Sequence, residues 1–99
     1  MKRAPRLDAN HSEIADAFKA LGCSVLSLAP MGKGVPDLLV GIGLRNYLVE
    51  IKDGSKVPSQ RKLTPDEVKF SRSWKGQWSV IESVSEVLTF VKAWKREIA

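Results

Sequence analysis

Residues 34–52 read Gly-Val-Pro-Asp-Leu-Leu-Val-Gly-Ile-Gly-Leu-Arg-Asn-Tyr-Leu-Val-Glu-Ile-Lys, and they contain two apolar runs. The first run covers residues 38–42 and the second covers residues 47–51, with Gly43-Leu44-Arg45-Asn46 between them. Short β-rich runs broken by Gly and Asn are typical of strands joined by a turn. The pattern therefore predicts two antiparallel strands of one hairpin, folded at residues 43–46.

Three charged residues stand in unusual places for such strands. Asp37 opens the first run directly after Pro36, and Glu50 and Lys52 interrupt the end of the second. Because strand side chains alternate between faces, Glu50 and Lys52 point the same way. Folding the hairpin brings the start of the first strand beside the end of the second. We therefore expect two carboxylates and one ammonium to converge at one end of a sheet.

This cluster has a recognisable chemical use. Hard cations such as Mg²⁺ take oxygen ligands, usually one or two carboxylates with water and substrate phosphate. A metal held by Asp37 and Glu50, with the Ile51 carbonyl as a further ligand, would polarise a phosphodiester and acidify water. Lys52 would orient that water or neutralise developing charge. The alternative is a pair of solvated carboxylates at a strand end with a salt bridge to lysine.

Two sets of residues carry a family resemblance. Gly34-Val-Pro-Asp37 with Glu50-Ile-Lys52 resembles the signature of the PD-(D/E)xK nuclease superfamily. Residues 48–54 and 63–67 add a similarity to the small stand-alone VRR-NUC domains of bacteria and bacteriophages, and the match runs from about residue 8 to residue 90. The resemblance implies an α/β restriction-endonuclease-like core, a mixed β-sheet flanked by helices, in a Mg²⁺- or Mn²⁺-dependent endonuclease.

The same resemblance implies a substrate and an assembly. It points to structure-selective hydrolysis of DNA, with branched or Holliday-type junctions as the leading substrate and a homodimer placing two metal sites for paired nicks. Two other functions stay open. One is a non-catalytic basic DNA-binding module on a nuclease-derived fold, and the other is a nuclease acting chiefly on RNA.

Length and composition suit one small intracellular domain. The chain has 99 residues, 27% of them charged, and a net charge of +5, which favours an anionic partner such as nucleic acid. Its single cysteine excludes an internal disulfide. We expect residues 1–7 to form a basic arm and residues 8–99 the nuclease domain. No apolar segment is long enough for a membrane span or a signal peptide, so we expect a cytoplasmic protein.

The first helix is expected to follow Asn10 and to end at Leu21, before Gly22. Glu13 has two interpretations that do not exclude each other. Asn10 and Glu13 have capping-box spacing, while the resemblance implies that an acidic residue on this helix supports the metal through water. His11 is expected to be exposed.

Two segments beside the acidic motif carry candidate nucleic-acid contacts. Residues 23–29 predict a strand, and the turn after it places Lys33 between two glycines, where it would meet a phosphate. The polar loop after Lys52 contributes a further set of contacts to the nucleic-acid backbone, namely Lys56, Gln60, Arg61 and Lys62. The role of Gln60 comes from the resemblance. The alternative for both segments is ordinary connections with solvated charges.

The last part of the chain predicts a helix, a strand and a second helix. Thr64-Pro-Asp-Glu67 is a helix start with a threonine cap, and the helix is expected to reach about residue 75. The pattern of residues 77–82 predicts a strand, and the pattern from Ser83 onward predicts a final helix. All three tryptophans (Trp74, Trp78 and Trp94) are expected to be buried. The predicted order of elements is αβββαβα.

Overall fold

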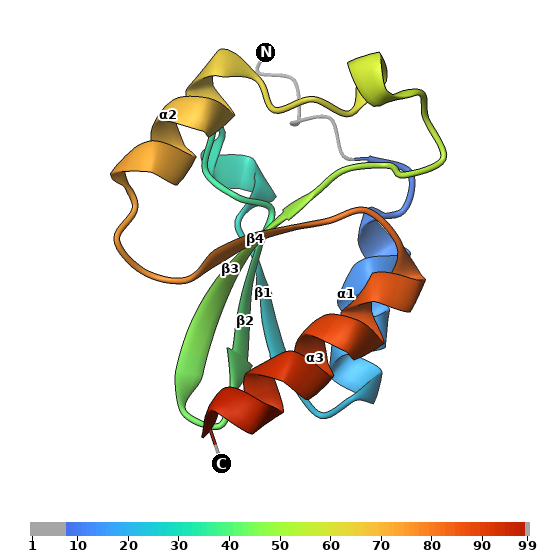
Figure 1. Cartoon of the computed structure of the whole chain (residues 1–99), viewed down its shortest axis with the longest axis vertical. Helices are drawn as coiled ribbons and strands as arrows, with labels where there is room; N and C mark the ends of the chain where they lie inside the picture. Colours follow the sequence, from blue (N-terminus) through green and yellow to red (C-terminus); the bar gives the residue numbers. More distant parts are fainter. Residues whose placement is uncertain (1–7, 99) are drawn as a thin grey trace.

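The computed structural model describes residues 8–98, so the expected arm at residues 1–7 lies outside the described residues (Figure 1). The predicted α/β order αβββαβα is confirmed, in a single compact domain. Two short 3-10 helices, η1 and η2, interrupt the loops. The elements are α1 (His11–Ala20), β1 (Ser24–Ser27), η1 (Ala29–Met31), β2 (Leu38–Ile42), β3 (Arg45–Ile51), η2 (Pro58–Gln60), α2 (Pro65–Ser73), β4 (Trp78–Ile81) and α3 (Val84–Ile98).

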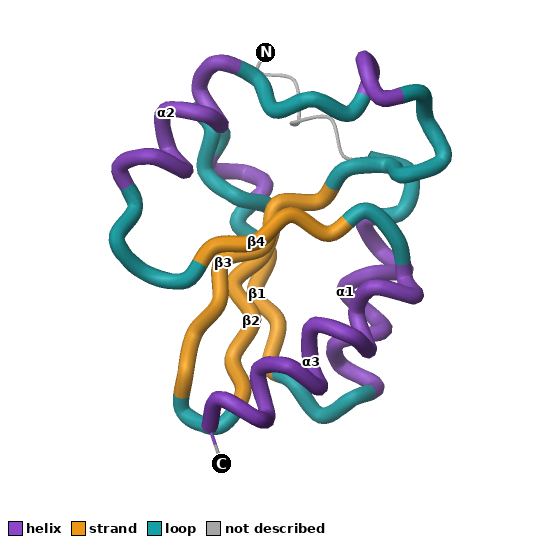
Figure 2. The backbone as a smooth tube through the Cα atoms, in the orientation of Figure 1, coloured by secondary structure: helices purple, strands orange, loops and turns teal. Residues whose placement is uncertain are grey.

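The four strands form one mixed sheet in the order β1-β2-β3-β4. The first three strands are antiparallel neighbours, and β4 runs parallel to β3. Figure 2 shows α1 and α3 together on one side of the sheet, whereas α2 lies at the end of the sheet away from the C-terminus. The expected mixed sheet flanked by helices is therefore present.

The hairpin turn is shorter than the sequence pattern indicates. Arg45 pairs with Ile42 and Asn46 pairs with Gly41, so only Gly43 and Leu44 remain between the strands. Gly43 has φ +56° and Leu44 has φ 64°, the left-handed values that a two-residue type I′ turn requires at both positions. Residues 45 and 46 therefore belong to β3, and their polar side chains are exposed beside the turn.

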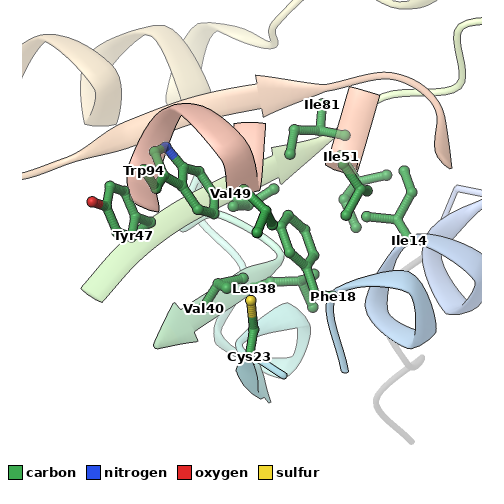
Figure 3. Close-up of a cluster of buried hydrophobic side chains, with 12 residues drawn as sticks. Ile14, Phe18, Cys23, Leu38, Val40, Tyr47, Val49, Ile51, Ile81 and Trp94 are labelled. Atoms are coloured by element: carbon green, nitrogen blue, oxygen red, sulfur yellow. The ribbon is translucent and has the colours of Figure 1, made fainter. Parts of the chain in front are cut away.

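The core lies between the sheet and the pair α1 and α3 (Figure 3). Alternation along β3 turns Val49 and Ile51 toward it, and both are fully buried. Trp94 of α3 stacks on Tyr47 with ring centroids 4.0 Å apart, and on Phe18 of α1 at 5.7 Å. This packing fixes β3 and therefore the direction of Glu50, which points to the opposite face.

Three predictions about individual side chains are wrong. His11 is buried, with 7% exposure, because the first turn of α1 packs inward. The Asn10 side chain makes no cap bond on α1 and instead reaches two strand ends. Trp74 is 47% exposed because α2 ends at Ser73 and contributes no buried residue. Trp94 is buried as predicted, and Trp78 is half-buried.

Helix α2 is held by its first turn. The predicted capping box is confirmed: the Glu67 N–H donates to Thr64 Oγ1 at 3.2 Å, and the Thr64 N–H donates to Glu67 Oε1 at 2.8 Å. Gly34, at φ +81°, packs so closely on the Asp66 backbone that a Cβ there would overlap it. The α2 N-terminus is thus pressed against the segment that leads into Asp37. Among residues 8–98, no helix combines the length and apolar character needed to cross a bilayer.

Candidate active site

The hairpin register places Asp37 opposite Glu50. Leu38 pairs with Val49, so the next pair outward joins these two carboxylates at the mouth of the hairpin. Asp37 Oδ2 accepts a hydrogen bond from the Ile51 N–H at 2.8 Å, and the Asp37 carbonyl accepts one from the Leu28 N–H at 2.7 Å. Backbone N–H groups of β3 and of the residue that follows β1 therefore fix Asp37, and its other carboxylate oxygen is not used by these bonds.

Glu50 is a buried carboxylic acid with only 3% of its surface exposed. Its Oε1 has no hydrogen-bond partner among the described residues. Burial, together with the hydrogen bond and negative charge of Asp37 and the charge of Glu67, raises the pKa of Glu50 from 4.5 to about 10. The nearby ammonium of Lys52 opposes this rise but is outweighed. Without a cation, Glu50 therefore keeps its proton at neutral pH.

Lys52 is held by a residue that lies 15 positions further along the chain. Its Nζ donates to Glu67 Oε1 at 2.7 Å, and the two side chains are only 12% and 16% exposed. Burial by itself would lower the pKa of Lys52, but the Glu67 hydrogen bond and the charges of Glu67 and Glu50 outweigh it and raise the pKa. Burial acts to raise the pKa of Glu67, yet bonds from Lys52 and the Thr64 N–H lower it overall. Both partners therefore stay charged.

Glu67 was missed as a site residue because its capping role already explained it. The capping box is real, and the same Oε1 that accepts from Thr64 also accepts from Lys52. Glu67 lies at the start of a helix, beyond the polar loop that follows Glu50 and Lys52. Its spacing from Lys52 in the sequence does not indicate a contact between the two. Only the folded loop brings it back to the strand end.

Residues just before α1 close the site from another side. Asn10 Nδ2 donates to the carbonyls of Lys52 at 3.1 Å and Glu82 at 3.0 Å, and so ties the ends of β3 and β4 together. Asp8 lies close enough to Lys52 and Asp37 for their charges to affect its pKa. Burial raises the pKa of Asp8, and the charge of Lys52 opposes the rise. Sequence analysis missed both roles. The usable signal was a pair of polar residues, Asp8 and Asn10, directly ahead of a helix.

The structure does not place Glu13 with the acidic pair. Glu13 is exposed on α1 and lines a neighbouring open pocket of about 440 Å³ with Asn10, Asp53, Arg61 and Glu82. Neither Asp37 nor Glu50 lines this pocket. The predicted support of the metal by Glu13 through water stays a prediction, and Asp8 is a second acidic candidate for that role.

The side chains predicted to contact nucleic acid differ in their exposure and in whether they already take part in other bonds. Lys33, Gln60 and Lys62 are exposed, and Lys33 has φ 52°. Arg61 instead organises the loop: it pairs with Glu82 at 2.7 Å and donates to the Lys56 carbonyl at 3.0 Å. Lys56 lies 3.9 Å from Asp8. The loop thus has a fixed shape, and Lys33 and Lys62, which form no ion pair among the described residues, are more available to a phosphate than Arg61.

The chemistry of the donor set fits one hard divalent cation. Asp37 and Glu50 supply two carboxylates, and the Ile51 carbonyl faces the same side of β3 as the N–H that binds Asp37. No group of three or more His, Cys, Asp or Glu side chains is arranged around a common point within residues 8–98. Two carboxylates are nevertheless the usual protein share for Mg²⁺, which keeps several waters. The buried, unpartnered Glu50 oxygen is the observation that agrees best with a cation.

Compared with protein-family models, with curated proteins and with solved structures, the chain gave no match in any of the three.

Proposed function

We propose that this chain is a Mg²⁺- or Mn²⁺-dependent, structure-selective DNA endonuclease that hydrolyses phosphodiester bonds. The observation that carries the proposal is Glu50, a buried acid with an unpartnered oxygen and a pKa raised to about 10 beside a second carboxylate. Such a pair is costly to ionise unless positive charge arrives. A divalent cation would displace the Glu50 proton and satisfy the buried oxygen.

A purely structural role explains these residues less well. A carboxylate pair that served only the fold would be expected at the surface or with every oxygen bonded, because an unmatched buried polar group costs stability. Here three hydrogen bonds support the same small group of residues. The Ile51 N–H donates to Asp37, Lys52 donates to Glu67, and Asn10 donates to the Lys52 carbonyl. Such support of charged side chains is typical of a functional site.

The chain's own residues would divide the work as follows. A bound Mg²⁺ or Mn²⁺ supplies charge that polarises the phosphodiester and acidifies the attacking water. Asp37, oriented by the Ile51 N–H, and Glu50 hold the ion, with the Ile51 carbonyl beside them. Lys52, fixed by Glu67, directs its ammonium toward the reacting phosphate and neutralises developing charge. Glu13 and Asp8 are assigned water-mediated support.

The choice of substrate rests on charge and on the resemblance. A net charge of +5 suits a polyanion, and the exposed Lys33 and Lys62 flank the acidic pair in sequence. Branched DNA cut by a homodimer in paired nicks is the first choice that the resemblance implies. RNA cleavage, or DNA binding without cleavage, is the alternative that the experiment must separate.

Cleavage of a panel of labelled DNAs tests the proposal: four-way junction, flap, duplex and single strand, with RNA of the same sequences. We expect cleavage of branched DNA in Mg²⁺ or Mn²⁺, none in EDTA, and a loss of at least about 100-fold in Asp37→Asn and Lys52→Ala, as for removal of one transition-state contact. Asp53→Asn is the matched control, since the side chain of this neighbouring aspartate is bonded only to Ser55 among residues 8–98 and its loss should leave cleavage unchanged.

Three results would contradict the proposal in different ways. Equal cleavage by Asp37→Asn and by the parent would remove the site assignment. Cleavage that prefers RNA would change the substrate. Binding that weakens with salt, with no cleavage of any nucleic acid in either metal, would leave the DNA-binding module as the function.

A further inference from the structure

Helix α2 is unusual in this fold because it buries none of its residues. Its fixed contacts gather at its N-terminus, where Glu67 binds Thr64 and Lys52 and where Gly34 abuts the backbone of Asp66. Short helices in water depend on tertiary packing for most of their stability. Because α2 is anchored at one end and no residue along it is fully buried, several of its side chains are accessible to a partner.

The open end of α2 carries an exposed tryptophan. Trp74 is 47% exposed, whereas Trp94 is 4% exposed in the core. Its ring stacks on Phe70, with centroids 5.4 Å apart and planes 16° from parallel, so the ring is held in place. Its indole Nε1 lies over Gly76, close enough that a Cβ at residue 76 would meet it at 2.8 Å. The indole is therefore pre-oriented and still accessible.

The residues near Trp74 in the sequence carry positive charge that no neighbouring acidic residue offsets. Lys69, Arg72 and Lys75 are exposed, and residues 68–81 contain no Asp or Glu. None of these three cations takes part in an ion pair among the described residues, where Lys52, Lys56 and Arg61 do. We call Lys69, Arg72, Trp74 and Lys75 the α2 platform.

We propose that the α2 platform binds unpaired nucleotides of a nucleic-acid strand, with one base stacked on Trp74 and the neighbouring phosphates on the three cations. An ordered aromatic ring interleaved with basic side chains is the arrangement by which proteins hold single strands without reading their sequence. A duplex offers the cations its phosphates but offers the ring no base face. The platform should therefore discriminate unpaired from paired nucleic acid.

The position of the platform deepens the proposed nuclease function, on which this step rests. Trp74 follows Glu67 by seven residues, which is about 10 Å along a helix. An unpaired strand advances at least the roughly 3.4 Å per nucleotide of a strand in duplex DNA, so Trp74 would meet a base no more than about three nucleotides from the phosphate beside Lys52. The preferred DNA would then carry unpaired bases within about three nucleotides of the cut, as a flap does and a fully paired four-way junction does not.

Binding in EDTA, with no cleavage, tests the platform separately from catalysis. Tryptophan fluorescence of the full chain is titrated with oligothymidylate and with a duplex of equal length. We expect quenching by oligothymidylate that Trp74→Phe reduces and Trp78→Phe, the matched control, does not. Trp74→Ala should weaken oligothymidylate binding about 5- to 150-fold, the range that loss of one stacked base gives. Duplex binding should change less than twofold.

The cations and the spacing have their own readouts. Arg72→Ala should reduce the slope of log affinity against log salt by about 0.7 for the single strand. In the cleavage assay, an abasic nucleotide within about three positions of the cut should impair the parent and leave Trp74→Ala unaffected. Circular dichroism checks that each variant folds, and the exposed location of Trp74 makes unfolding unexpected.

The proposal is overturned if Trp74→Ala binds oligothymidylate as tightly as the parent, or if single-strand and duplex binding fall together. Absence of any metal-dependent cleavage, with Trp74-dependent single-strand binding intact, would instead overturn the nuclease function and leave the platform standing.

Discussion

The two ends of the β2–β3 hairpin store conformational free energy in different ways. At the turn end, Leu44 has φ 64° and a fully exposed side chain, and Ile98 of α3 packs against Gly43. At the other end, Asp37 and Glu50 face each other across the ends of the two central strands, and the buried Glu50 has an unpartnered oxygen. One cost is local backbone geometry, and the other is a buried carboxyl group with an unpartnered oxygen.

This difference shows which of the two free-energy costs a bound ligand can remove. Nothing that binds would relax Leu44, because its strain lies within its own backbone dihedrals. A cation at the opposite end would relieve the Glu50 carboxyl directly, and such relief is binding free energy. We therefore expect the site end to respond to pH and metal, and the turn end to respond only to a change of residue.

The largest effect on stability is expected for Glu50→Gln without metal. Because the pKa of Glu50 is raised from 4.5 to about 10, the folded protein binds one more proton than the unfolded chain between these values. Stability should therefore fall as pH rises through this window. Glu50→Gln cannot ionise, so it should be more stable by roughly 2 kcal/mol at pH 8 and lose much of the pH dependence.

Urea denaturation in EDTA from pH 5 to pH 9 measures this effect, with Asp53→Asn as the control that removes an exposed carboxyl. Mn²⁺ should then stabilise the parent and not Glu50→Gln, because the variant lacks the charged ligand. If the stability of the parent instead rises across this pH range, Glu50 is ionised without a cation. The expectation that a cation relieves the buried Glu50 carboxyl would then be wrong.

An intermediate effect is expected where the site end meets α2. Thr64→Ala should cost about 1 kcal/mol, the usual value of a lost helix cap. Glu67→Gln also removes the partner of Lys52, so it should cost more and lower the rate of cleavage, which Thr64→Ala should not do.

A double-mutant cycle with Lys52→Met and Glu67→Gln isolates the ion pair. We expect a coupling of about 1 kcal/mol, because the pair is partly shielded from water. A coupling energy indistinguishable from zero would show that α2 is held by its cap alone. The two ends of the hairpin would then differ only through Glu50.

The hairpin and the order of elements were predictable because they depend on local signals. Alternation fixed which residues of β3 face the core, and the register then required Asp37 to meet Glu50. The Thr64–Glu67 box was equally local, since its four residues lie in one turn. These features needed no knowledge of the distant chain.

The supporting contacts were not predictable because they join distant segments. Asn10 lies 42 residues from Lys52 and 72 from Glu82, and its spacing to Glu13 suggested a cap instead. His11 and Trp74 were misjudged for a related reason. Residue type suggested an exposed histidine and a buried tryptophan, but the packing of each helix decides which face is covered, and α2 is left largely uncovered.

The smallest effect is expected at the turn, from Leu44→Gly. A left-handed residue with a Cβ costs about 1–2 kcal/mol, and glycine removes that cost while adding about 0.4–1 kcal/mol of unfolded-state entropy. The net gain should be roughly 0.5–1 kcal/mol, with no change in metal or DNA binding. Leu44→Ala is the matched control, because it removes the exposed side chain and keeps the Cβ. If alanine stabilises as much as glycine, the exposed leucine rather than its backbone is the cost, and the turn end stores no strain for the site end to be compared with.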